Sequence, residues 1–140
     1  MDLKFATKFK DLEKERILDL FMMYQMIELL LFMHLYPGEI ITPVRDEGEF
    51  KKLDKEVNTK TLGKITAKYN QKFPNNEHSL KDLLETVTPQ RNSFMHSFWI
   101  MIASAKDETE AMDFGKIVLD DFEKNANALL DAIYASNLNK

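Results

Sequence analysis

The stretch from Ile17 to Tyr36, ILDLFMMYQMIELLLFMHLY, is apolar on almost every face of a helix. It has about the length of a membrane span. Asp19, Glu28 and His34 interrupt it, however, and ionisable groups are costly in hydrocarbon, while no basic flank marks an orientation. We therefore expect a buried helix of a protein that does not enter a membrane.

A helix that is apolar on all sides must be covered on all sides, and this chain is small. Its 140 residues, 44% of them hydrophobic and 30% charged, suit a single domain over 1–140. We expect the helix to be central and partly covered by a second copy of the chain. Adaptable packing residues fit that position, and a methionine-rich cofactor pocket is the alternative; the methionines are Met22, Met23, Met26 and Met33.

The rest of the chain shows helical spacing divided by turn residues. Pro37-Gly38 ends the apolar helix, and a loop is expected from Gly38 to Gly48. Three- and four-residue spacing then predicts helices whose inward positions are Phe50, Leu53 and Val57, then Leu62, Ile65, Tyr69 and Phe73, and finally Phe114, Val118, Phe122, Leu129 and Ile133. Only residues 98–103, FWIMIA, could form a short strand.

Capping patterns indicate where the later helices begin. The helices expected over 79–87 and 107–138 each open with Ser or Asp followed three residues later by an acid. Between them, Thr88 offers an N-cap and Pro89 suits the first helical position, so a further helix is expected to start there. These elements predict an all-α protein, an antiparallel bundle of four to five helices.

The residue types limit the chemistry. The chain has no cysteine, which excludes disulfides, thiolate metal sites and cysteine nucleophiles. His34 and His78 have no ligand-spaced partners, and Asp120, Asp121 and Glu123 are interpreted as the solvated face of the last helix, so neither metal nor cofactor is expected. The N-terminal sequence MDLKFATKFKDLEKER lacks the apolar core of a signal peptide, and we expect a cytoplasmic protein.

One short segment, PQRNSFMHSFW, combines residues suited to phosphate chemistry. If a helix starts at Pro89, Arg91 lies in its first turn, where free N–H groups and the helix dipole favour an anion. Asn92 shares a face with His96, four residues later, and a long Arg side chain can reach the same patch. A guanidinium can hold two phosphate oxygens, and an imidazole can move a proton near neutral pH.

The same pattern has a structural interpretation. A histidine beside Phe94, Phe98 and Trp99 is commonly a hydrogen-bonded core residue, and Arg91 could pair with a carboxylate such as Glu85. The direct succession of Arg and Asn, just after the expected helix start, favours the functional interpretation.

The string Arg91-Asn92-Ser93-Phe94-Met95-His96 resembles the R-N-x-x-x-H signature of HEPN domains (higher eukaryotes and prokaryotes nucleotide-binding). Leu62-Gly63-Lys64-Ile65 is similar to the LGxLI-type segment of some members, and the order of helices is similar along the chain. The resemblance implies a HEPN-like bundle and, as in many members, a metal-independent endoribonuclease of the toxin or antiviral-defence type, with a cleft shared across a homodimer.

Carried over by position, the resemblance gives Arg91 the role of stabilising a phosphorane-like transition state. His96 would assist proton transfer as the RNA 2′-hydroxyl attacks, and Asn92 would orient both. Toxin members that are modified by a nucleotidyltransferase antitoxin resemble R-x-x-x-x-H-x-Y, and Phe98 stands in place of that Tyr here, so the resemblance does not extend to this control mechanism. An antitoxin or another regulatory partner is left open. Some members act without nuclease activity, which leaves open a module that binds a nucleotide or a protein partner.

An RNA ligand must be compatible with a net charge of −4. The charge is uneven, because seven lysines stand against two acids between Lys51 and Lys72. A four-residue repeat forms a stripe that could meet a phosphate backbone, namely Lys60, Lys64, Lys68 and Lys72. The alternative is an ordinary solvated helix face.

Overall fold

The computed structural model describes residues 1–35, 46–58, 62–72 and 78–135, and within these ranges the chain is helical without a strand. The helices of these ranges are α1 (Leu3–Leu12), α2 (Lys14–Leu35), α3 (Glu47–Asn58), α4 (Leu62–Lys72), α5 (His78–Met95), α6 (Ser97–Ala103) and α7 (Glu108–Ala135). The all-α class is confirmed. The expected number of four to five helices is too low for these ranges, and residues 98–103 form a helix, not a strand.

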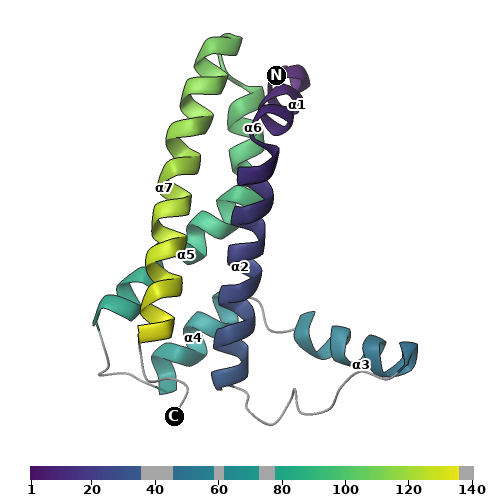
Figure 1. The fold of residues 1–140 in the computed structure, drawn as a ribbon, viewed down its shortest axis with the longest axis vertical. Coiled ribbons are helices and arrows are strands. Elements are labelled where there is room, and N and C mark those ends of the chain that lie inside the picture. Colours follow the sequence, from purple (N-terminus) through teal and green to yellow (C-terminus); the bar gives the residue numbers. More distant parts are fainter. Residues whose placement is uncertain (36–45, 59–61, 73–77, 136–140) are drawn as a thin grey trace.

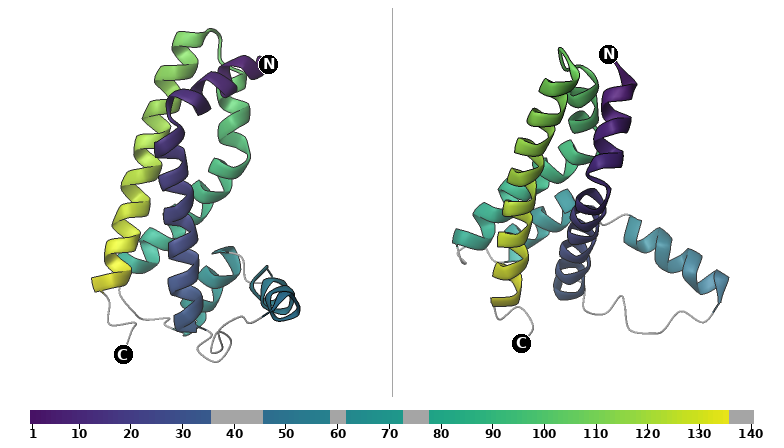
Figure 2. Two further views of the ribbon diagram at one scale, coloured as in Figure 1. Left: turned by 45° about the vertical axis from the view of Figure 1, so that its right-hand side comes forward. Right: turned by 45° about the horizontal axis from the view of Figure 1, so that its top comes forward.

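Figure 1 shows α2 and α7 running along the long axis in the same direction, while α5 and α6 return in the opposite direction. α7 packs on α2 and α5, α1 packs on α6 and α7, and α4 lies against α2 and α5. The antiparallel arrangement therefore holds for the α5–α6 segment against its neighbours, but not for α2 against α7. Figure 2 shows α3 extending away from these helices.

α2 buries one face and exposes the opposite one. Leu20, Tyr24, Ile27 and Leu31 are at most 1% exposed and recur at helical spacing. The opposite face carries large apolar side chains that are 41–55% exposed, which we call the α2 apolar stripe: Met22, Met26, Leu29 and Met33. The expected role of the methionines as packing residues holds for Met23 within the single chain, and for the other three it depends on cover by a second copy.

Two helix breaks raise the number of elements above the expectation. Glu13 leaves helical geometry, with φ −110° and ψ 25°, between α1 and α2. Its carboxylate contacts Arg16 and Lys116, which gives this acid partners at the junction. His96, with φ −131° and ψ −76°, separates α5 from α6.

The expected helix start at Thr88 and Pro89 is wrong, because both lie inside α5. Thr88 does not cap a helix. Its hydroxyl donates to the Leu84 carbonyl at 2.7 Å and lies 3.0 Å from the Thr66 hydroxyl on α4. Proline lacks an N–H and costs one helical hydrogen bond. α5 nevertheless continues through Pro89 and packs on α4 and α7.

The remaining helices agree with the sequence pattern at most positions. Asp107 accepts from the Glu110 N–H at 2.8 Å, as the capping pattern before α7 predicts. On α4, the inward positions Leu62, Ile65 and Tyr69 are buried. The prediction fails at Phe50 and Phe114, which are 56% and 47% exposed. The predicted positions Leu53, Val57 and Phe73, and residues 38–45 of the loop expected to reach Gly48, lie outside the side chains and residues that the structure describes. The end of that loop is wrong, because Glu47 and Gly48 belong to α3.

Candidate functional site

The three motif residues lie at the end of α5 and the break that follows it. Arg91 is in the penultimate turn of α5, Asn92 opens the last turn, and His96 is the residue between α5 and α6. The expectation that Arg91 lies in the first turn of a helix is therefore wrong, and no free N–H groups of a helix start are available to an anion beside it. Asn92 and His96 are exposed, while Arg91 is partly buried.

Arg91 is held by Glu28 of α2. Its Nε lies 3.1 Å from Glu28 Oε1, and the two side chains are 26% and 22% exposed. The N–H is not aligned for a hydrogen bond, so the contact is an ion pair. Arg91 Nη1 donates to Asn92 Oδ1 at 3.3 Å. The carboxylate partner is thus Glu28 and not the Glu85 considered from sequence.

Burial raises the pKa of Glu28, and the nearby positive charge of Arg91 opposes this rise without cancelling it. Tyr24, one turn earlier on α2, is 1% exposed, and burial raises its pKa also. Its hydroxyl has no hydrogen-bond partner among the described residues. The Arg91–Glu28 pair therefore lies beside a poorly solvated part of α2, where a charge is stabilised mainly by its partner.

Polar residues of α7 complete this region. Gln90 Nε2 donates to Asp121 Oδ2 at 3.0 Å, and Asn125 Nδ2 donates to Gln90 Oε1 at 3.2 Å. These bonds tie α5 to α7 at the residue before Arg91. Sequence reasoning missed both this link and Glu28, although a lone acid on an apolar helix face was a usable signal for a buried partner.

His96 is not a core histidine. It is exposed, whereas Phe94 and Phe98 on either side are 3% and 1% exposed and their rings stack with centroids 6.0 Å apart. The aromatic residues of the motif therefore belong to the core and leave His96 at the surface. Within the described residues no hydrogen bond or ion pair joins His96 to Arg91 or Asn92, so the structure brings together only the latter two.

The lysine stripe is described only in part. Lys64 is exposed and Lys68 half-buried on α4, while Lys60 and the side chain of Lys72 lie outside the described part of the structure. The acidic group on α7 is not simply a solvated face. Arg16 forms ion pairs with Asp120 and with Glu123, the latter at 3.0 Å.

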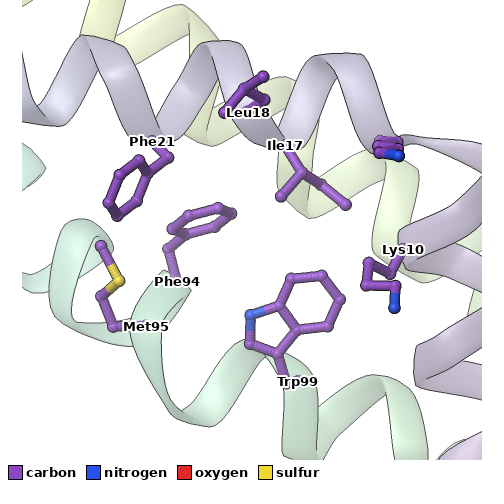
Figure 3. Close-up of a pocket in the computed structure, with 8 residues that line it drawn as sticks. Lys10, Ile17, Leu18, Phe21, Phe94, Met95 and Trp99 are labelled. Atoms are coloured by element: carbon purple, nitrogen blue, oxygen red, sulfur yellow. The ribbon is translucent and has the colours of Figure 1, made fainter.

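A pocket of about 380 Å³ adjoins the motif. Figure 3 shows Phe21 and Ile17 of α2 facing Phe94, Met95 and Trp99 across it. Met95 lies one turn after Arg91 and directly before His96. Apart from two lysines, the lining side chains are apolar or aromatic; the full lining is Lys10, Lys14, Ile17, Leu18, Phe21, Phe94, Met95 and Trp99.

The described ranges contain neither a metal-binding cluster nor a membrane-spanning helix. They contain no group of three or more His, Asp or Glu side chains placed to hold a metal ion. None of their helices is both long and apolar enough to cross a membrane. Comparison with family models, with curated proteins and with solved structures found no match.

Proposed function

We propose that this protein is a metal-independent endoribonuclease of the HEPN type, acting through Arg91, Asn92 and His96, with a cleft completed by a second copy of the chain. The observation that carries the proposal is the placement of the motif: Asn92 and His96 reach the surface while the aromatic residues between and after them are buried. The motif thus offers polar side chains in a fixed place at a helix break.

The residue chemistry suits cleavage by the RNA 2′-hydroxyl. His96 exposes an imidazole, the side-chain group that most often serves as a general acid or base in catalysis. The guanidinium of Arg91 can stabilise charge that builds on the phosphate, and the contact with Asn92 at 3.3 Å limits its rotamers. Because Glu28 contacts Nε, the Nη groups remain the ones that could meet a phosphate.

A second copy would enlarge the site. The α2 apolar stripe lies on the helix that also holds Arg91 through Glu28, so pairing along this stripe would place two motifs in one assembly. Lys64 and Lys68 on α4 would add charge for the RNA backbone. An antitoxin or another regulatory protein would act by covering the same cleft.

One observation favours a second candidate function. The charge of Arg91 is already balanced by Glu28 in a partly buried pair, as in a residue that braces two helices. Under this alternative the protein is a non-catalytic HEPN-like module that binds a nucleotide or a protein partner.

Incubation of the purified protein with RNA of mixed sequence in EDTA tests the proposal. We expect cleavage that leaves cyclic-phosphate ends and spares DNA. His96→Ala should lower the rate about a hundredfold or more, the usual scale for a proton-transfer group. His78→Ala, at the opposite end of α5, is the matched control and should keep full activity. Cleavage that needs added magnesium would overturn the mechanism.

The test of Arg91 needs a second substitution, because removal of Arg91 alone would leave the partly buried Glu28 carboxylate without its partner. We compare Glu28→Gln with the double variant Glu28→Gln/Arg91→Ala, in which neither partner is left as an unpaired charge. The double variant should be about a hundredfold slower than Glu28→Gln, and Arg91→Lys should not restore the rate because a point charge cannot replace the planar fork. Equal rates in the two would assign Arg91 a structural role and support the binding module.

If the cleft is shared between two protomers, mixed dimers of the inactive variants should be partly active. Heterodimers of His96→Ala and Glu28→Gln/Arg91→Ala protomers retain one His96 and one Arg91 from opposite chains. Mixing the two inactive proteins should therefore recover part of the activity. No recovery, with heterodimers shown to form, would confine each site to one protomer.

A further inference from the structure

We propose that the pocket between α2, α5 and α6 binds the chain of an anionic amphiphile, a medium-chain fatty acid or its like, with the carboxylate at Lys10 and Lys14. The inference does not depend on the proposed nuclease activity, since it rests on the pocket alone. The volume of about 380 Å³ falls in the range of small-molecule sites.

The α2 wall has a charged end and an apolar end. Lys14, Ile17, Leu18 and Phe21 follow each other at three- and four-residue spacing and so form one row along the helix. Lys14 and Phe21 are seven residues apart, about 10.5 Å along the axis. A ligand with a charged head and an unbranched apolar tail matches this polarity.

The opposite wall is aromatic. Figure 3 shows Phe94 and Trp99 facing Ile17 and Phe21, with Lys10 at the Trp99 end and Met95 near Phe21. Lys10 of α1 and Lys14 of α2 thus lie at the same end of the pocket. Both walls place positive charge at one end and apolar surface at the other.

The two lysines have little else to neutralise them. Lys10 Nζ lies 3.7 Å from Asp11 Oδ1, and both side chains are more than half exposed, so this ion pair is weak. No carboxylate of the described residues forms an ion pair with Lys14. A carboxylate between Lys10 and Lys14 would complement this local charge.

The lining argues against other occupants. Beyond the lysines, the Trp99 indole N–H is the one strong hydrogen-bond donor among the lining side chains, so a nucleobase would bury ring nitrogens and exocyclic groups without partners. A second copy of the chain laid over the pocket would have to supply carboxylates at the lysine end. A saturated hydrocarbon chain can pack against the apolar walls without hydrogen-bond partners and without carboxylates from a second copy.

Trp99 is the only tryptophan of the chain, so its fluorescence reports directly on the pocket. We would titrate the protein with decanoate below micelle-forming concentrations, checked by light scattering, and with decanol and decyltrimethylammonium as head-group controls. We expect a saturable change in emission, with decanoate binding more tightly than either control. Octanoate, which lacks two methylenes, should bind about tenfold more weakly.

Four variants, one of them a control, separate recognition of the head group from recognition of the tail. Lys10→Gln and Lys14→Gln should each weaken decanoate about two- to fivefold and leave decanol unchanged. Lys4→Gln removes the same charge from α1 outside the pocket and should change nothing. Phe21→Ala shortens the apolar wall and should weaken decanoate and decanol alike.

Three results would overturn the proposal. The first is the absence of a saturable response to decanoate, including the case in which Trp99 emission changes only with protein concentration, as burial by a second copy would cause. The second is equal affinity for decanoate and decanol. The third is unchanged decanoate affinity in the variant that combines Lys10→Gln with Lys14→Gln.

Discussion

Glu28 carries a carboxylate on a part of α2 that is otherwise apolar, and its side chain is only 22% exposed. Burial disfavours the charged form, and Arg91 supplies the compensating positive charge. The pair fixes α5 on α2 directly before the helix break at His96. At the scale of single residues, this contact decides how much of the Arg91 guanidinium a ligand can reach.

The raised pKa of Glu28 predicts a specific pH dependence of stability. Since the folded carboxyl binds its proton more tightly than the unfolded one, its stabilising effect is present at low pH. As the pH rises from 4.5, the ordinary pKa of a glutamate carboxyl, through the raised pKa of Glu28, this stabilising effect is lost. Glutamine is neutral at every pH. The free energy of unfolding of Glu28→Gln should therefore increase relative to that of the native protein as the pH rises over this range.

Urea unfolding of both proteins at a series of pH values measures this difference. Glu85→Gln, which changes an exposed acid on α5, is the control and should run parallel to the native curve. A Glu28→Gln curve that also runs parallel would show that burial of Glu28 has no energetic consequence.

At the scale of elements, α1 approaches α7 closely at a glycine. A Cβ at Gly115 would lie 2.5 Å from the Phe9 ring. Phe9 is fully buried and its ring packs against Phe98 and Trp99, with centroids 5.8 and 6.3 Å away. The ring has no free space into which to move, so the absence of a side chain at Gly115 sets the distance between the two helices.

Gly115→Ala should therefore destabilise the protein by about 1–3 kcal/mol through overpacking, against a gain of about 0.5–1 kcal/mol from helix propensity. Thermal unfolding measures the change. Gly48→Ala is the matched control, because its Cβ would meet only the Asp46 side-chain oxygen at 3.3 Å. Phe9→Leu should lessen the penalty of Gly115→Ala if the ring is its cause. An alanine variant as stable as the native protein would disprove the close contact.

At the scale of the whole molecule, the α2 apolar stripe is the surface most in need of a cover. Its four large side chains are exposed together along one helix, whereas scattered exposed apolar residues need no explanation. This exposure agrees with the expectation that one small domain cannot cover the helix, and it supports pairing between copies of the chain.

We expect the native protein to sediment as a dimer at micromolar concentration. Met26→Lys, in the middle of the stripe, should shift it to a monomer, because an unpaired charge would be buried in the interface. The shift should come without loss of helix, since Met26 is 41% exposed in the single chain. Ile117→Lys changes a residue of α7 that is 66% exposed and lies outside the stripe, and it should leave the dimer intact. A native protein that sediments as a stable monomer would refute the shared cleft.

The sequence by itself determined the features that are encoded within one or two helical turns. Apolar spacing predicted the buried face of α4, and the Asp107 and Glu110 pattern predicted the start of α7. Both are local, because the interacting groups are near neighbours in the chain. The all-α class followed from the same local signals.

Only the tertiary structure decided the surroundings of the motif. Thr88 can cap a helix or bond back within one, and its contact with Thr66 on another helix accompanies the second outcome. Arg91 had several possible carboxylate partners, and the packing of α5 on α2 selected Glu28. The pocket and the exposed stripe likewise depend on which faces of separate helices meet. Such contacts join residues distant in sequence, so no short-range pattern specifies them.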